Sequence, residues 1–430
     1  MVRSAGGAVL LAGIFAIGLN LRGFISGLPP LFNEFHDALG LSTGDLAIVG
    51  AIPVLCFAVF SLPAAPLSRR FGEERVLGGA LLVLIAGLLL RGIAPGVMLY
   101  PGTILAGAAM ALGNVLLPSL VKRRHPGRAG ALTGLYLAGL SLGGILGPLI
   151  AVPVFTAAGG GPGAARLALG LWAIPAVAAF GAWIPQLRYR TRPDSPSAAA
   201  PTRLDAELAS GAMAEARPVP RRSALVRQRL AWQIAAFFGL QSMCYYAVLS
   251  WLPTLLRDRG MTAATAGTMV AVMNFGGTFT STTIPVLAQR RDNQRLLITL
   301  VVAATGVGLT GAAFGPLGGT TAAFAFVLGL GQGGGLSIGI YLAVGRAADS
   351  ATSASLSAFA QGGGYLLASF GPVLIGFLRT ATGAWTIPVL AVIGLLGCEL
   401  AAGWFAGRPG GQIRGPGDVG RAVMAPGASR

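Results

Sequence analysis

The amino-acid sequence predicts an all-α membrane protein with twelve transmembrane helices in two six-helix halves. Hydrophobic residues make up 54% of the 430 positions, and 66 glycines add to this apolar content. Charged residues account for only 10%, against about 25% in soluble domains, so a soluble chain of this size could not cover its surface. Apolar runs long enough to cross a bilayer recur along the chain. An ordinary cytosolic enzyme, a disordered chain and a secreted disulfide scaffold are therefore excluded.

The first six expected spans lie between the N-terminus and a change of composition near residue 186. They cover residues 8–31, 44–67, 76–95, 98–121, 129–156 and 166–185. The first run follows Arg3 and so resembles a signal peptide. It continues past residue 30, contains Asn20 and Arg22, and has no clean small-residue cleavage site, so we interpret it as a span.

The last six expected spans follow the same rule of about 20 apolar residues each. They cover residues 231–256, 263–288, 296–314, 319–344, 353–378 and 385–406. Their prolines and glycines are compatible with membrane helices, because neighbouring helices satisfy freed backbone groups and small residues allow close approach.

The connecting segments divide the chain. Residues 186–229 are rich in Pro, Ala, Ser and Arg without apolar periodicity, which is typical of a flexible cytoplasmic linker. The linker separates an N-terminal half, residues 1–185, from a C-terminal half, residues 230–407. A tail rich in Gly and Pro, residues 408–430, is predicted to be disordered.

The basic residues set the predicted orientation. With the N-terminus in the cytoplasm, the inside segments hold 25 basic residues and the outside segments hold five, Arg91 among them, while Arg22 lies within a span. Both termini are therefore expected on the cytoplasmic side of the cytoplasmic (inner) membrane. Because these charges lie between apolar runs and not on one face with aromatic residues, the net charge of +17 does not indicate nucleic-acid binding.

The two halves repeat each other. Arg-rich turns follow the second and eighth spans, at residues 66–75 and 285–295, and a Gly-Pro pair recurs at residues 147–148 and 371–372. A parallel repeat of this kind is typical of a secondary transporter whose site lies between two six-helix halves.

This layout resembles the major facilitator superfamily over residues 8–406, although Arg69 stands where the superfamily's signature has an aspartate. Shorter segments are similar to the cyanate porter and 2-nitroimidazole transporter family, with Gly23 in place of an expected proline. They are residues 19–22, 113–118, Lys122, 126–128, 133–136, 251–253, 257–260, 329–334 and 361–365. The resemblance implies the major facilitator fold, a cavity lined by spans one, four, seven and ten, and small anions or planar polar heterocycles as substrates.

Arg22 is the sharpest candidate residue. It lies about fourteen residues into its helix, roughly 21 Å along the axis, and a charge at mid-span costs about 2.5–3.5 kcal/mol on insertion scales. The only acidic residue well inside a span, Glu399, is expected near the cytoplasmic end of span twelve, at a different depth. We therefore expect Arg22 to grip an anionic or hydrogen-bond-accepting group of the substrate. The alternative is a structural arginine that caps backbone carbonyls or neighbouring side chains.

Amide and phenol side chains within the spans are the further candidates for substrate binding, because they line a site without a charge cost. The alternative is that these side chains only form hydrogen bonds between helices. The predicted set is Asn20, Asn114, Tyr136, Gln241, Tyr245, Gln332, Gln361 and Tyr365. Tyr246 and Asn274 are also polar and within spans, but they are not included.

The two basic turns are candidates for gating at the cytoplasmic side, where they would brace the halves. Topogenic charge is the open alternative. The residues concerned are Arg69, Arg70, Arg75, Arg290, Arg291 and Arg295.

No pattern predicts catalysis, a cofactor or a metal. The Gly331-x-Gly333 pair lies inside an apolar run with no lysine after it, unlike a phosphate loop. His36 and His125 are expected on opposite sides of the membrane, and no cluster of cysteines or carboxylates accompanies them. The expected partners are a small-molecule substrate and membrane lipid, with a monomer as the functional unit.

The sequence therefore favours a secondary transporter, not an enzyme, that moves a cyanate-like anion or a nitroimidazole-like heterocycle by alternating access. The alternative is a proton-coupled drug-type efflux antiporter, which the Gly143-x-x-x-Gly147-Pro148 pattern favours and the lack of a carboxylate in the cavity disfavours. A sensor or an intramembrane enzyme is disfavoured because no signalling module or catalytic constellation is visible.

Overall fold

The computed structural model describes residues 2–94, 96–189, 191, 227–347, 350–410 and 413. Helices account for nearly all of them, and the described part contains no named strand, only one isolated bridge between Ala347 and Ile413. The predicted all-α class is confirmed. Most of the expected linker and tail, residues 192–226 and 414–430, lies outside the described residues.

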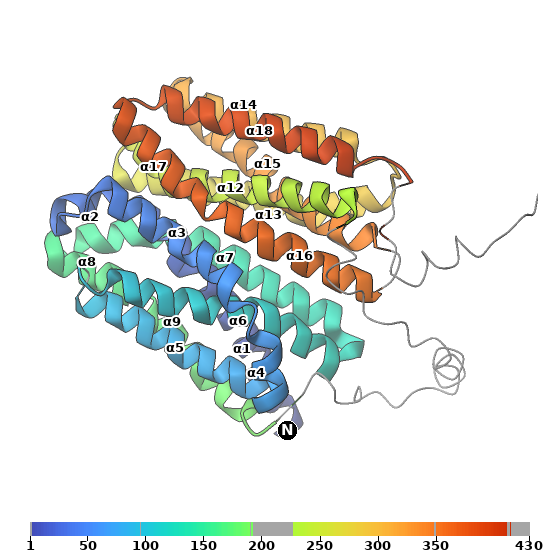
Figure 1. The fold of residues 1–430 in the computed structure, drawn as a ribbon. Coiled ribbons are helices and arrows are strands. Elements are labelled where there is room, and N and C mark those ends of the chain that lie inside the picture. The colour runs from blue at the N-terminus through green and yellow to red at the C-terminus, as the bar shows by residue number, and fades with distance from the viewer. Residues whose placement is uncertain are drawn as a thin grey trace, which may run out of the picture.

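The first bundle holds the helices up to residue 186 (Figure 1). They are α1 (Val2–Ser26), η1 (Pro29–Leu31), α2 (Phe32–Leu39), α3 (Thr43–Phe60), α4 (Ala64–Phe71), α5 (Glu73–Ile93), α6 (Leu99–Arg124), η2 (Pro126–Arg128), α7 (Ala129–Ala157), α8 (Gly161–Gly170), α9 (Ala173–Trp183) and η3 (Ile184–Gln186). Three expected spans are interrupted. The first ends as η1 and α2, the second breaks before α4, and the sixth is divided into α8 and α9.

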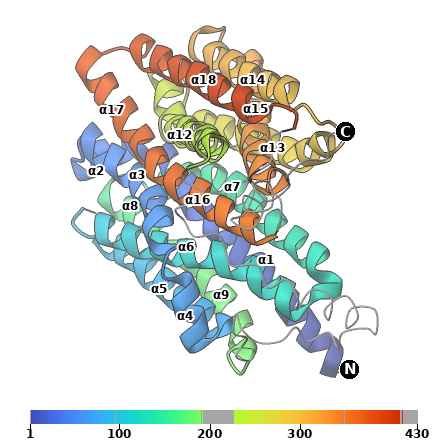
Figure 2. The ribbon, with the colours of Figure 1, turned by 45° about the vertical axis from the view of Figure 1, so that its right-hand side comes forward.

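The second bundle holds the remaining helices. They are α12 (Arg229–Asp258), α13 (Ala263–Gln289), α14 (Arg295–Phe314), α15 (Gly319–Gly345), α16 (Ser350–Ala368), α17 (Phe370–Thr382) and α18 (Thr386–Ala406). Figure 2 shows the two bundles side by side, with α3 and α7 of the first facing α16 and α13 of the second. Phe370 begins α17 directly after the end of α16, so the eleventh expected span is also divided.

Eleven helical segments of the described chain are long and apolar enough to cross a membrane. The one expected span not among these eleven, residues 263–288, coincides with α13, which is long enough but carries six threonines. Several of these hydroxyls donate to nearby carbonyls, as Thr278 does to Asn274 O at 2.9 Å and Thr283 to Phe279 O at 3.1 Å. The threonines make α13 more polar than its neighbours. Because these hydroxyls donate to backbone carbonyls, they leave no unpaired donors among the described bonds of the helix.

Close helix packing depends on glycine. A Cβ atom at Gly143 of α7 would lie 2.1 Å from the carbonyl oxygen of Leu19 of α1, and one at Gly333 of α15 would lie 2.0 Å from that of Gly277 of α13. Any side chain at these positions would force the helix pairs apart. Gly143, which begins the pattern that the sequence analysis associated with antiporters, therefore serves the contact between α1 and α7.

The two bundles touch closely at the end of the molecule where α7 ends and α13 begins. A Cβ at Gly267 would lie 2.8 Å from Pro148 O, and one at Gly376 would lie 2.9 Å from the Cβ of Ala47. We call this end the sealed end. It is the end that carries α2 and α17 in Figure 1, away from the start of α1.

Candidate functional site

Arg22 lies in the last quarter of α1 and joins the two bundles. Its side chain is half-buried, and its Nη2 donates a hydrogen bond to the hydroxyl of Tyr245 on α12. The guanidinium carbon also lies 5.2 Å from the centre of the Tyr245 ring, which is the geometry of a cation–π contact. The predicted candidates Arg22 and Tyr245, 223 residues apart in sequence, are thus in direct contact.

Asn274 of α13 extends this contact into a closed loop of interactions. The Tyr245 hydroxyl donates to Asn274 Oδ1 at 3.2 Å, and Asn274 Nδ2 donates to Gly144 O of α7 at 2.9 Å. Gly144 in turn faces Arg22, because a Cβ there would lie 3.4 Å from Arg22 Cδ. We call Arg22, Gly144, Tyr245 and Asn274 the central cluster. Two of its residues come from each bundle, and its contacts hold the arginine between the bundles.

The charge of Arg22 has no acidic partner. Within the described part of the chain, Tyr245 is its one hydrogen-bond partner, and no carboxylate is among the groups that interact with it. A guanidinium has five N–H donors, so most of its donor capacity is unused by protein. Glu399 of α18 is 3% exposed and lies near Cys244 in the second bundle, so it does not neutralise Arg22.

Phenol rings surround the central cluster. Tyr136 and Tyr365 both lie within electrostatic range of Arg22. The hydroxyl of Tyr136 donates to Asn114 Oδ1 inside the first bundle. Tyr365 of α16 stacks on Phe57 of α3, with ring centres 5.2 Å apart, and so crosses between the bundles. Of the predicted set, Arg22, Tyr136, Tyr245 and Tyr365 are therefore brought to one region, with Asn114 behind Tyr136.

The other predicted residues lie elsewhere. Gln241 is 2% exposed and donates to the backbone oxygen of Gln332 at 2.9 Å, so these two amides join α12 to α15 within one bundle. Asn20 donates to Ala16 O of its own helix at 2.8 Å. Gln361 is half-buried on α16. These four amides make no described contact with the central cluster.

Two interior residues, Asn274 of the second bundle and Arg91 of the first, were not among the predicted site residues. Asn274 was not included among the site residues, although it completes the central cluster. Arg91 was counted among the charges of the outside segments, and at the end of α5 its side chain is only 2% exposed and turns into the protein. Its position at a span's end gave no sign of the direction in which the side chain points.

The described bonds of the two basic turns stay within their own bundles. Arg75 Nε donates to Leu187 O at 3.4 Å, and Arg295 Nε donates to Trp404 O at 3.0 Å. The neighbouring carboxylates of Glu73 and Glu74 are fully buried. They bind groups from α6 and from the chain after η3, namely Ser119, Arg123, Arg124 and Thr191. Gating by these arginines stays a prediction.

An ion pair joins the bundles at the sealed end. Arg257 at the end of α12 donates to Glu34 of α2, and both side chains are largely buried. Beside them, the rings of Phe32 and Trp251 meet edge to face with centres 5.7 Å apart. No pairing of Arg257 was predicted from the sequence, because its partner Glu34 lies in a distant part of the chain.

Two apolar helical bundles with a polar cluster between them define this chain as a membrane transporter. The family model of the Major Facilitator Superfamily matches residues 10–368. The chain belongs to the Major Facilitator Superfamily, as its sequence motifs predicted, and this is a family of transporters and not of enzymes.

Curated relatives are similar to this chain along most of its length. An uncharacterized transporter, YycB of Bacillus subtilis, is 34% identical over 93% of this chain and 93% of its own length. The 2-nitroimidazole transporter of Escherichia coli is 34% identical, covering 89% of this chain and 91% of itself. The cyanate transport protein CynX of Escherichia coli is 28% identical, covering 90% and 95%. The predicted family resemblance is confirmed.

Solved structures agree with the fold. A bacterial homologue of the human lysosomal transporter Spinster, crystallised in an inward-facing and occupied conformation, superposes with a TM-score of 0.68. The two proteins share 13% sequence identity, and the match covers 94% of each chain. At this identity the likeness concerns the fold alone.

Proposed function

We propose that this protein is a secondary transporter that moves a cyanate-like anion or a nitroimidazole-like heterocycle across the cytoplasmic membrane by alternating access. The observation that carries the proposal is Arg22, a half-buried guanidinium between the bundles whose described partner is a neutral phenol. A cation with unused donors in this position attracts an anionic or strongly accepting group. Phenol rings around it suit a flat or linear solute.

The relatives support the same class of solute. Two of them are named for a 2-nitroimidazole and for cyanate, and both match most of this chain. These solutes are small, and each presents either a negative charge or acceptor atoms in a plane. Arg22 in the central cluster is suited to both, because its fork of N–H groups can hold two acceptor atoms at once.

We further propose that the structure represents the conformation that opens to the cytoplasm. The sealed end lies away from the start of α1, and both termini are proposed to be cytoplasmic on the excess of basic residues in the inside segments. Separation of the bundles at the sealed end, with closure at the opposite end, would give the second conformation. The protein is proposed to work as a monomer, because each chain contains both bundles.

Uptake into proteoliposomes tests the proposal. We expect Arg22→Ala to abolish uptake of radiolabelled cyanate and 2-nitroimidazole, while insertion and elution volume stay normal. Arg22→Lys retains the charge without the fork, so we expect a raised KM for both solutes. Normal kinetics in Arg22→Ala would refute a binding role for this arginine.

Reversal of the pH gradient in the same vesicles separates the proposal from the efflux alternative. A proton antiporter would accumulate solute in inside-out vesicles only when the lumen is acidic. The Gly143 pattern that favoured this alternative has a packing role between α1 and α7. We therefore expect uptake in right-side-out vesicles without a requirement for an outward proton gradient.

A further inference from the structure

Arg91 reaches the interior of the protein by an unusual path. It lies in the last turn of α5, where an arginine normally extends to the membrane surface. Here its stem crosses α6 at Gly102, where a Cβ would lie 2.6 Å from Arg91 Cγ. With no side chain at Gly102, the guanidinium passes between the helices toward α1 and is 2% exposed.

The Arg91 guanidinium is buried without hydrogen-bond partners for two of its nitrogens. Nε and Nη1 are inaccessible to solvent and have no partner in the described part of the chain. The group lies over the ring of Phe24, with the guanidinium carbon 5.5 Å from the ring centre, and no described carboxylate pairs with it. A buried charge that lacks both a counter-ion and hydrogen bonds is unfavourable, so a ligand that supplies both is strongly favoured.

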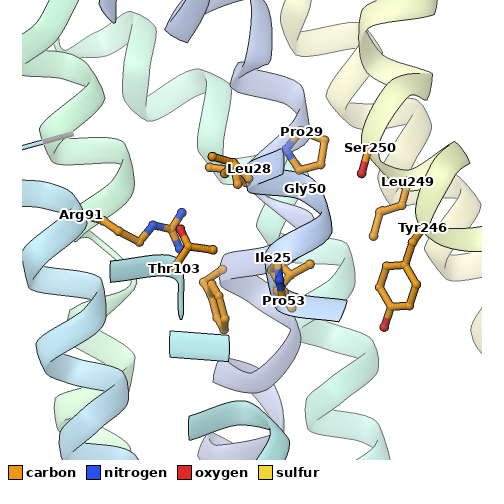
Figure 3. Close-up of a pocket in the computed structure, with 12 residues that line it drawn as sticks. Ile25, Leu28, Pro29, Gly50, Pro53, Arg91, Thr103, Tyr246, Leu249 and Ser250 are labelled. Carbon is orange, nitrogen blue, oxygen red and sulfur yellow. The ribbon is translucent and has the colours of Figure 1, made fainter. Parts of the chain in front are cut away.

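The guanidinium points into a cavity between the two bundles (Figure 3). The first bundle contributes residues of α1, α3 and α6 to its walls, including Phe24 and Thr103. Tyr246, Leu249 and Ser250 of α12 close it from the second bundle. The centre of a water-sized sphere can occupy about 10 Å³ of it, which is room for about one water in this conformation. Because the walls belong to both bundles, separation of the bundles would enlarge it.

The cavity adjoins the central cluster through two consecutive residues of α12. Tyr245 binds Arg22, while Tyr246 lines the cavity that Arg91 enters. Their rings meet edge to face, with centres 5.1 Å apart. Arg22 and Arg91 are therefore two cations without acidic partners, on two sides of one tyrosine pair.

We propose that the Arg91 cavity is a second anion site, which holds a small monovalent anion on its way between Arg22 and the sealed end. This inference rests on the proposed function. It adds a second binding site, which none of the sequence motifs assigns. The anion accepts hydrogen bonds from Nε and Nη1 of Arg91 once separation of the bundles has enlarged the cavity and made these two nitrogens accessible. The apolar walls favour a weakly hydrated ion, and the small volume limits it to a few atoms.

Equilibrium dialysis of the purified full chain against radiolabelled thiocyanate tests this proposal. Thiocyanate is linear, monovalent and weakly hydrated, and ionic strength is held constant with gluconate. We expect two bound ions per wild-type chain, one in Arg91→Met and one in Arg22→Met. Fewer than two ions in the wild type would overturn the proposal, and so would two ions in a folded Arg91→Met protein.

A second variant, which retains Arg91, provides an independent test in case Arg91→Met does not fold. In Gly102→Ala the new methyl group would lie 2.6 Å from both Arg91 Cγ and Gly87 O, so it shifts α6 against α5 and displaces the Arg91 stem. We expect the affinity of one site to fall at least tenfold while the other is unchanged. Gly79→Ala is the matched control, because a Cβ at Gly79 of α5 would meet no atom within 4 Å. Equal effects of the two variants would overturn the proposal.

The same data separate this inference from the proposed function. If Arg22→Met still binds two ions but Arg91→Met binds one, the Arg91 site stands and the role proposed for Arg22 fails. If Arg22→Met binds none and Arg91→Met binds the wild-type number, the Arg91 site fails and the proposed function stands.

Discussion

Removal of one hydroxyl group should open the sealed end. In Tyr245→Phe, Arg22 loses its described hydrogen-bond partner and Asn274 Oδ1 loses its donor, while the ring under the guanidinium stays. A hydrogen bond to a charged group contributes about 1.5–3 kcal/mol. Arg22 is half-buried, so water can replace part of this bond, and we take about 1.5 kcal/mol, which is roughly a tenfold change in an equilibrium constant.

The bond joins the bundles in the sealed conformation, so its loss should raise the fraction of open molecules about tenfold. Ala47→Cys reports this fraction, because Ala47 is 2% exposed at the sealed end. The reporter is placed in a background without Cys56, Cys244 and Cys398, and its rate of labelling by a polar maleimide is measured. Tyr341→Phe is the control, since the described residues hold no hydrogen-bond partner for that hydroxyl.

A labelling rate in Tyr245→Phe within twofold of the parent, in a protein that elutes and melts normally, would refute this reasoning. It would mean that the hydroxyl contact persists in both conformations or contributes nothing to the equilibrium. A tenfold increase in both Tyr245→Phe and Tyr341→Phe would show that the effect is not specific to the bridge between the bundles.

Three more substitutions, at Glu34, Arg257 and Glu399, test the ends and the interior of the bundles. The Glu34–Arg257 pair is partly exposed, so it should contribute about 1 kcal/mol. Glu34→Gln and Arg257→Gln should each raise labelling of the same reporter several-fold, and the double variant should add little; full additivity would show that the two charges are not coupled. Glu399 makes no described contact with Arg22, so Glu399→Gln should transport at the parental rate with an equal or higher melting temperature. Loss of uptake on that substitution would instead identify a proton carrier within α18.

Much of the fold follows from the sequence, because bilayer thickness fixes the length of each apolar run. The expected spans therefore fall on α1 to α18, including α13, whose six threonines lower its hydropathy. The interruptions were not predicted. Two of them occur where Pro29 begins η1 and where Pro63 precedes α4, and proline within an apolar run does not tell whether a helix bends or ends.

The types of residue in the candidate site could be predicted from the sequence, but the contacts between them could not. Arg22 stood out because a charge in an apolar run is costly. Its partner Tyr245 lies in the other bundle, and only the packing of α1 and α7 against α12 and α13 brings the two together. Gln241 and Gln332 looked equally suitable, yet they face each other inside one bundle. The residue type limits which side chains are candidates for substrate binding. The orientation of each helix about its axis determines which of these side chains contact one another.

The distribution of ion pairs supports the proposal that the interior carries anions. Glu73, Glu74 and Glu34 each pair with an arginine, at Arg123, Arg124 and Arg257, and all three pairs lie at helix ends. Arg22 and Arg91 also face the space between the bundles, and the described part of the chain offers neither of them a carboxylate.

A purely structural arginine would gain from an acidic partner, because an unpaired buried charge is strongly destabilising. A permanent partner would, however, occupy the donors that a passing anion needs. The absence of described carboxylates beside these two arginines, in a chain that pairs Glu34, Glu73 and Glu74 with arginines, is therefore what the proposed path for anions requires. It also gives a direct test, since a carboxylate placed beside Arg22 in Gly144→Asp should block uptake by filling the site from within.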